Sequence, residues 1–193
     1  SFLKFLNKTP IIGKSFVCID NTELYKLTKR VKNKNFYSYG FSKKANFQVL
    51  RPFYKKDYSV FDLKISIPGE KTKIIKKIRL NLIGSHNILN SVAAISLCLH
   101  IGINIKVIKR SLKNFSGIQR RLTKLFNFKG REFFDDYAHH PTEIKSVLKS
   151  LRVTSSDRKI ISVFQPHRYS RLKLLNKDFS YSFKDSDLVV LCP

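Results

Sequence analysis

One short stretch limits the fold more than any other, because an apolar run ends there in two acids, two histidines and a proline. The aromatic residues on both sides of Gly130 predict two strands, and Pro141 suits the first turn of a helix over 142–151. Asp135 and Asp136 then lie at the carboxyl end of a strand. Open α/β sheets hold their ligands at that end, so the stretch predicts an α/β fold with a site at this position.

The same acids have a simpler interpretation as helix caps. A single aspartate before a helix is more often a cap than a ligand-binding group. Here Asp135 and Asp136 are followed by His139 and His140 directly before the predicted helix. Two acids, two imidazoles and a helix N-terminus together favour a binding or catalytic site.

A second group of polar residues precedes an apolar pattern of helical spacing. The pattern predicts a helix that begins near His86 and places Asn87 and Asn90 on one face of its first turn. A carboxamide can both donate to and accept from a purine edge. Asparagines near a glycine are also common as caps and turn residues, so this signal is weak by itself.

Paired arginines follow the predicted helix 105–114. Arg120 and Arg121 stand in a loop before the next strand, within Gly117–Arg121. In a chain this basic such a pair is most often solvated, but guanidinium groups can also bind phosphate oxygens in a fork geometry.

A fourth polar group follows the predicted buried strand at 160–163. His167, Arg168 and Arg171 lie between that strand and another predicted helix. The two arginines could hold an anionic substrate or could simply be solvated at the surface, and the residues alone do not decide between these interpretations.

The four motifs in this order resemble the Mur ligase superfamily, and within it the branch that adds L-alanine. They are Gly84–Ala94, Gly117–Arg121, Asp135–Glu143 and Gln165–Arg171. The resemblance runs through essentially the whole chain. A sister branch that adds a murein tripeptide is the alternative, and Gln165–Tyr169 favours the alanine-adding branch.

The resemblance implies ATP-dependent ligation of L-alanine to UDP-N-acetylmuramate through an acyl phosphate, a cytoplasmic step of peptidoglycan precursor synthesis. ATP and Mg²⁺ are the cofactors it implies, with the metal ligands outside this chain. Matched position by position, it implies a nucleotide-binding set of His86, Asn87, Asn90, Arg121 and Asp136, a catalytic set of Arg121, Asp136 and His140, and a substrate-binding set of His139, His140, His167, Arg168 and Arg171.

The chain also departs from the family pattern. Leu122 and Thr123 stand where an aromatic residue and an acid are usual, which affects the packing around Arg121. The family's UDP-binding domain and phosphate loop have no counterpart here, because Gly13-Lys14-Ser15 lacks the glycine that a phosphate loop needs at position 8. We therefore expect an internal piece of a longer enzyme, or the product of an incomplete gene, that is inactive alone.

The predicted organisation is α/β throughout. Residues 1–116 would form the latter part of the family's central ATP-binding domain, with a helix at 21–30 and strands at 35–39, 46–53, 58–67 and 73–82. Alternating residues in Phe61–Ile67 predict a sheet with one solvated face. Residues 117–193 would begin a Rossmann-like carboxyl-terminal domain.

The charge supports a rival hypothesis. The chain of 193 residues has a formal net charge of +25, which would attract phosphate backbones and is compatible with a basic nucleic-acid-binding module. The basic residues are spread along the chain and no RNA-binding motif is visible, so we expect no specific nucleic acid and no membrane partner. The cysteines Cys18, Cys98 and Cys192 are too far apart in sequence to predict a zinc site.

Overall fold

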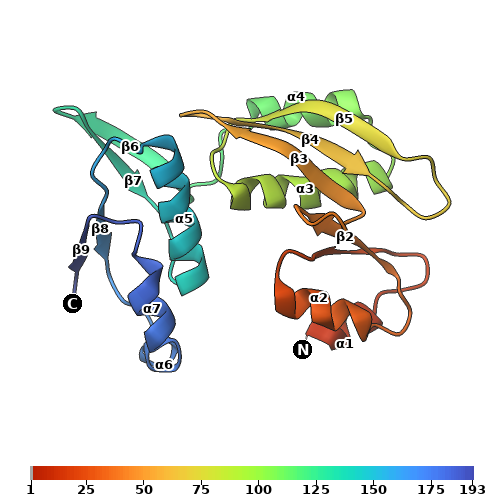
Figure 1. Ribbon diagram of the computed structural model, residues 1–193, viewed down its shortest axis with the longest axis horizontal. Coiled ribbons are helices and arrows are strands. Elements are labelled where there is room, and N and C mark those ends of the chain that lie inside the picture. The colour runs from red at the N-terminus through yellow and green to blue at the C-terminus, as the bar shows by residue number, and fades with distance from the viewer. Residues whose placement is uncertain (1) are drawn as a thin grey trace. The chain divides into compact units, whose positions relative to one another are not determined.

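The protein is described by a computed structural model covering residues 2–193, which divides into two compact units. One unit comprises the residues up to Phe53 together with Tyr58–Asn81 and His86–Phe115. The other comprises Tyr54–Asp57, Leu82–Ser85 and Ser116–Pro193. Each unit is described below by itself (Figure 1).

The first unit is built on a five-stranded sheet in the order β1-β2-β3-β4-β5. Strands β1 and β2 pair in parallel, as do β2 and β3, whereas β4 and β5 are antiparallel. Its elements are α1 (Phe2–Asn7), β1 (Ser15–Cys18), α2 (Thr22–Lys29), β2 (Phe36–Gly40), β3 (Phe47–Tyr54), β4 (Ser59–Ile65), β5 (Lys73–Leu80), α3 (Ser85–His100) and α4 (Ile105–Asn114).

Helix α3 contributes three apolar residues to the first unit's core. Ile88 and Val92 are fully buried and Ile95 nearly so, as the helical spacing predicts. Helix α4 is fastened to β5 by the Lys109 ammonium, which donates to the Lys76 carbonyl at 2.7 Å. Both helices run beside the β3–β5 part of the sheet (Figure 1).

A glycine is required at the end of β2, because the Asp20 carboxylate from the turn between β1 and α2 lies against the backbone there. Gly40 has a φ of 153°, and a Cβ atom there would lie 2.4 Å from the Asp20 carboxylate. That carboxylate accepts the backbone N–H groups of Phe41 and Ser42, at 2.8 and 2.9 Å. The missing side chain of Gly40 therefore lets Asp20 hold the chain after β2.

The alternating pattern of β4 predicts that Asp62 and Lys64 lie on a solvated face, and the structure confirms this only in part. Lys64 is half-buried, but Asp62 is 8% exposed. The Asp62 carboxylate accepts the Lys77 N–H at 2.7 Å and lies 2.5 Å from the Arg51 guanidinium. Burial raises the pKa of Asp62, but these two contacts outweigh it and lower that pKa overall. An acid at a nominally solvated position is buried here because both neighbouring strands supply it with donors.

The second unit contains two two-stranded sheets and three helices. Strands β6 (Thr123–Phe128) and β7 (Arg131–Asp135) form an antiparallel hairpin, and β8 (Ile161–Phe164) pairs in parallel with β9 (Leu188–Leu191). Helices α5 (Pro141–Thr154), α6 (Tyr169–Leu174) and α7 (Asn176–Ser182) complete it.

The predicted alternation of strands and helices is confirmed in this second unit, with three differences, one of which is that two helices, α6 and α7, stand where one was predicted. Helix α5 extends past the predicted end to Thr154 and buries Ile144 and Leu148 against Phe179. The β6–β7 hairpin shares no sheet with β8 and β9, so the unit has no single continuous sheet among the described residues. No helix between residues 2 and 193 combines the length and the apolar character that crossing a membrane requires.

Candidate functional site

The second unit brings together three of its segments, which are two loops and the start of a helix. The residues at 120–122 precede β6, the residues at 135–140 join β7 to α5, and Arg168–Arg171 enter α6. Most of the side chains that the sequence nominated in this unit lie on these three segments. They form a cluster of arginines, histidines and carboxylates.

Asp136 joins the first two loops through its carboxylate. One oxygen accepts the Leu122 N–H and the other accepts the Ala138 N–H, both at 2.7 Å. The Tyr137 N–H adds a third link, because it donates to the Arg120 carbonyl at 2.8 Å. Asp136 therefore does not cap α5, and the simpler interpretation of the aspartates as helix caps is wrong for this residue.

The arginine loop adopts an unusual backbone conformation. Arg120 and Leu122 have φ angles of 59° and 50°, a region that side-chain-bearing residues seldom occupy. Backbone conformations of this kind persist only where surrounding contacts enforce them. The Asp136 carboxylate and the Tyr137 N–H are the contacts that do so here.

Asp135 makes a looser contact with the same loop. Its carboxylate lies 3.5 Å from Arg120 Nε, and the Arg120 guanidinium stacks 4.9 Å from the centre of the Tyr137 ring. The side chains of Arg120 and Asp135 are 61% and 39% exposed. An ion pair this exposed contributes little to stability.

His140 is the residue that caps α5. Its Nδ1 accepts the Thr142 N–H at 3.3 Å, and Pro141 occupies the first helical position as predicted. The neighbouring ring turns elsewhere, since His139 Nδ1 lies 2.8 Å from the Tyr137 carbonyl. The two adjacent histidines therefore have different partners.

Glu143 is a part of the cluster that the sequence interpretation did not select. Its Oε2 accepts the His139 N–H at 3.2 Å, and its Oε1 lies 3.7 Å from the Arg121 guanidinium. Its position three residues after the cap His140 is that of the acid in a capping box, which is the signal that could have identified it. Partial burial raises the pKa of Glu143, but the His139 N–H, the His139 ring and Arg121 outweigh it and lower that pKa.

The third segment, at the start of α6, reaches the cluster through one arginine. Arg171 Nη1 donates to the His139 carbonyl at 3.3 Å, and the side chain is half-buried. Arg168 and His167 are exposed. Arg168 precedes α6 with a φ of 66°, a strained backbone angle for a residue with a side chain, and its side chain makes no capping bond.

The remaining nominated residues belong to the first unit. His86, Asn87 and Asn90 lie in the first turns of α3 (Ser85–His100), as predicted. Asn90 is exposed, and Asn87 is half-buried. The structure thus groups Arg121, Asp136, His139, His140 and Arg171 in the second unit and these three residues in the first.

Mg²⁺ requires several oxygen ligands in near-octahedral geometry. Within residues 2–193, no three histidine, cysteine or acidic side chains gather in a way that could hold a metal ion. The carboxylates of Asp136 and Glu143 are engaged by N–H groups or by a guanidinium. We therefore assign no metal ligand among residues 2–193.

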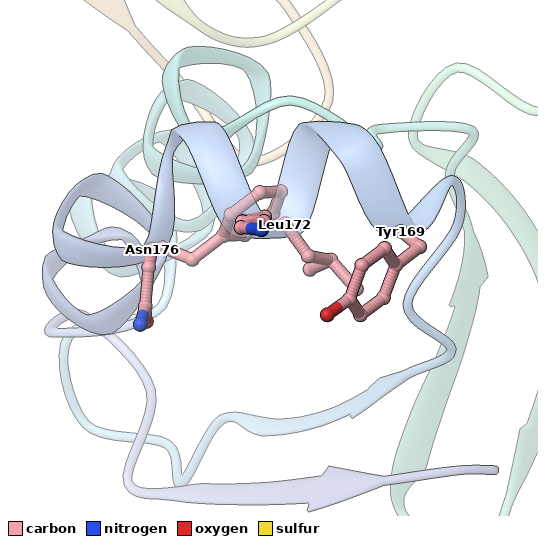
Figure 2. Close-up of a pocket in the computed structure, with 5 residues that line it drawn as sticks. Tyr169, Leu172 and Asn176 are labelled. Carbon is pink, nitrogen blue, oxygen red and sulfur yellow. The ribbon is translucent and has the colours of Figure 1, made fainter.

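A shallow hollow of about 360 Å³ lies beside α6 and α7. It is lined by Tyr169, Leu172, Lys173, Asn176 and Phe179, from α6 and α7 (Figure 2). The nominated residues of the cluster do not line it, so we do not count it as a part of the candidate site.

Two family models match the chain. One, described as the Mur ligase middle domain, matches residues 1–98. The other, described as the glutamate ligase domain of Mur ligases, matches residues 120–193.

Curated relatives align with the chain from end to end. The UDP-N-acetylmuramate–L-alanine ligase of Pelagibacter ubique is 50% identical over 192 residues, which are 100% of this chain and 41% of the relative. The ligase of the same name from Brachyspira hyodysenteriae is 45% identical over 191 residues, 99% of this chain and 40% of the relative. The chain thus spans about two fifths of the length of these relatives.

Solved structures share the fold. The UDP-N-acetylmuramate-alanine ligase of Thermotoga maritima matches 86% of this chain and 35% of its own, with a TM-score of 0.69 and 25% identity. MurF from Acinetobacter baumannii matches 98% of this chain and 40% of its own, with a TM-score of 0.76. Its identity of 18% supports a shared fold alone.

Proposed function

The chain belongs to the Mur ligase family, and from that premise we propose that it is part of an ATP-dependent enzyme that joins L-alanine to UDP-N-acetylmuramate. In this proposal residues 1–116 are the latter part of the central ATP-binding domain, and residues 117–193 are the first part of the carboxyl-terminal domain. The observation that carries the proposal is the 50% identity, over the whole chain, to a relative named for this reaction.

The chemistry explains why a cluster of cations suits this reaction. A carboxylate is a poor electrophile because its oxygen is a poor leaving group. In the proposed reaction, a carboxylate oxygen of UDP-N-acetylmuramate attacks the γ-phosphorus of ATP, and ADP leaves. The amine of L-alanine then attacks the acyl carbon, a proton leaves the nitrogen, and inorganic phosphate departs as the amide forms.

Negative charge gathers on phosphoryl and carbonyl oxygens in both steps, so fixed cations lower both barriers. We assign Arg121 to the phosphates, because its side chain is 52% exposed and its guanidinium is oriented by the cluster. Asp136 keeps a lone pair on each oxygen after accepting two N–H groups, and we assign it to the ribose or phosphate region. His140 is assigned beside the reacting groups, on the loop that Asp136 joins to Arg121.

The remaining assignments concern recognition. In the proposal, His86, Asn87 and Asn90 face the adenine, since the carboxamides of Asn87 and Asn90, in the first two turns of α3, can pair with a purine edge. His139, His167, Arg168 and Arg171 face the amino acid and the muramyl substrate, because guanidinium groups bind carboxylates in a fork geometry. The proposed substrates, ATP and a uridine nucleotide, are cytoplasmic, and we place the activity there.

The test restores the rest of the enzyme around this chain. The matched segment of the Pelagibacter ubique ligase is replaced by these 193 residues, and phosphate release is measured with ATP, Mg²⁺, UDP-N-acetylmuramate and L-alanine. We expect turnover that requires all the substrates. The proposal would be overturned if a folded chimera released phosphate at the same rate with the complete set of substrates as it does without L-alanine.

Two conservative variants of the chimera test the recognition residues. Lysine keeps the charge of arginine but loses its planar fork. Arg168→Lys and Arg171→Lys should therefore raise the Michaelis constant for L-alanine or for the muramyl nucleotide by about tenfold, and that for ATP far less. Unchanged Michaelis constants in both variants would remove these residues from the substrate site.

A further inference from the structure

The two carboxylate oxygens of Glu143 contact two different segments of the cluster. Oε2 accepts the backbone N–H of His139 at 3.2 Å, within the loop that leads into α5. Oε1 lies 3.7 Å from Nη1 of Arg121, on the loop before β6. The carboxylate is 35% exposed and the arginine side chain 52% exposed, so the pair lies at the border between protein and solvent.

The distance to Arg121 distinguishes this contact from a hydrogen bond. At 3.7 Å the two groups attract each other as an ion pair, and the N–H groups of the guanidinium remain available to another acceptor. An ion pair this exposed adds little to stability, but it favours one direction of the guanidinium without occupying its N–H groups. Such a guanidinium is suited to meeting a phosphate oxygen without first losing a strong bond.

The contact with His139 connects Glu143 to the start of α6 as well. The His139 ring lies 3.8 Å from Oε2 of Glu143, and the His139 carbonyl accepts Nη1 of Arg171 at 3.3 Å. A single side chain is thus in contact with the arginine loop on one side and with the segment that holds Arg171 on the other.

We propose that Glu143 is a positioning residue that holds Arg121 and the His139 segment in one arrangement before the nucleotide binds. The inference rests on the proposed function, in which Arg121 faces the phosphates. Glu143 itself does not touch the reacting groups. It acts by fixing the direction of the Arg121 guanidinium and by keeping the loops on either side of it together.

A merely structural role for Glu143 makes a different prediction. An acid at the third position of α5 stabilises the helix through its dipole and through the capping box, whatever Arg121 does. In that case the effects of changing Glu143 and Arg121 on the rate would be independent. In the positioning role the two effects overlap, because Glu143 acts through Arg121.

The first test is a double-mutant cycle in the chimera described above. Glu143→Gln keeps the size of the side chain and removes its charge, and we expect kcat/KM for ATP to fall about tenfold. In an Arg121→Ala background, the same change should lower kcat/KM by less than about twofold. Losses that simply multiply would overturn the proposal.

The matched control is Glu23→Gln. Glu23 also lies in the first turn of a helix, α2, and its carboxylate also contacts a cation, with Lys26 at 2.9 Å. It has no place in the cluster, so this variant should leave kcat/KM for ATP unchanged. A loss equal to that of Glu143→Gln would show that any first-turn acid has the effect, and would overturn the positioning role.

A second readout uses the chain itself and does not depend on the proposed function. The Nε–Hε signal of Arg121 in nitrogen-15 NMR reports the surroundings of the guanidinium. It should move in Glu143→Gln and stay in place in Glu23→Gln. If the unsubstituted chimera is inactive but this signal moves, the proposed function fails and the orienting contact stands; if the signal is unchanged, the inference about Glu143 fails.

Discussion

Replacing Asp136 tests whether one carboxylate holds the arginine loop in place. Asp136→Ala removes the acceptor for two backbone N–H groups, those of Leu122 and Ala138, each 2.7 Å from a carboxylate oxygen. It also removes the contact that keeps Leu122 at a φ of 50°. The loop should then relax toward ordinary backbone angles, which moves Arg121 away from the cluster.

The magnitude follows from the two hydrogen bonds. A hydrogen bond to a charged group contributes about 1.5 to 3 kcal/mol when water is excluded. Both bonds are only partly buried, so water replaces part of what is lost. We expect Asp136→Ala to lower the free energy of unfolding of the second unit by about 2 to 3 kcal/mol. Asp136→Asn keeps one acceptor oxygen and should lose about half as much.

The assay is urea unfolding followed by circular dichroism, because the chain contains 8 tyrosines and no tryptophan. Asp135→Ala is the matched control. It removes a neighbouring carboxylate whose partner Arg120 is 3.5 Å away and 61% exposed. The control should cost only about 0.2 to 1 kcal/mol. If Asp136→Ala were no more destabilising than Asp135→Ala, the carboxylate would not be what holds the loop.

Three further predictions concern stability. The pKa of Glu132 is lowered by the hydrogen bond from Lys124 and by the other cations around it. The charged carboxylate therefore stabilises the fold above its unfolded-state pKa of about 4.3, and this contribution is lost as pH falls through the lower pKa of the folded state. Glu132→Gln should therefore be less stable than wild type by about 1 to 3 kcal/mol at pH 7 in urea unfolding, with the gap closing below about pH 4; a gap independent of pH would contradict this. Gly40→Ala should lower the melting temperature, because its Cβ would lie 2.4 Å from the Asp20 carboxylate; an unchanged melting temperature would show that this turn is not constrained. His140→Ala should cost about 0.5 to 2 kcal/mol as a lost helix cap, and His140→Asn should restore most of it; equal losses in both variants would argue against the capping role.

The sequence is sufficient to locate two of the helices, α4 and α5. Helix α4 has the predicted bounds, Ile105–Asn114, because its apolar residues keep a strict helical spacing. Helix α5 begins with Pro141 as predicted, since the fixed φ of proline suits a first turn. These local signals depend only on residues a few positions apart.

Contacts between distant segments were beyond the reach of the sequence. Asp136 takes a donor 14 residues away, and that donor is available only because Leu122 adopts a left-handed backbone angle that its side chain does not favour. No residue type marks such a position unless it is glycine. The burial of Asp62 has the same origin, because Arg51 and Lys77 on the adjacent strands enclose it.

Glu143 differs from both cases. Its spacing from the helix cap was visible in the sequence and indicated a local role. Its contact with Arg121 crosses from one loop to another and depends on the fold of the second unit. The capping signal alone would therefore have identified the residue without its partner.

The central claim is that this chain forms part of the alanine-adding ligase, and one competition measurement tests it most directly. The chimera is supplied with ATP, Mg²⁺ and UDP-N-acetylmuramate, with L-alanine and a murein tripeptide both present as acceptors. The two products are then separated and quantified by mass spectrometry. We predict that the alanine adduct forms in large excess. Preferential formation of the tripeptide adduct would contradict the assignment, while leaving membership of the Mur ligase family intact.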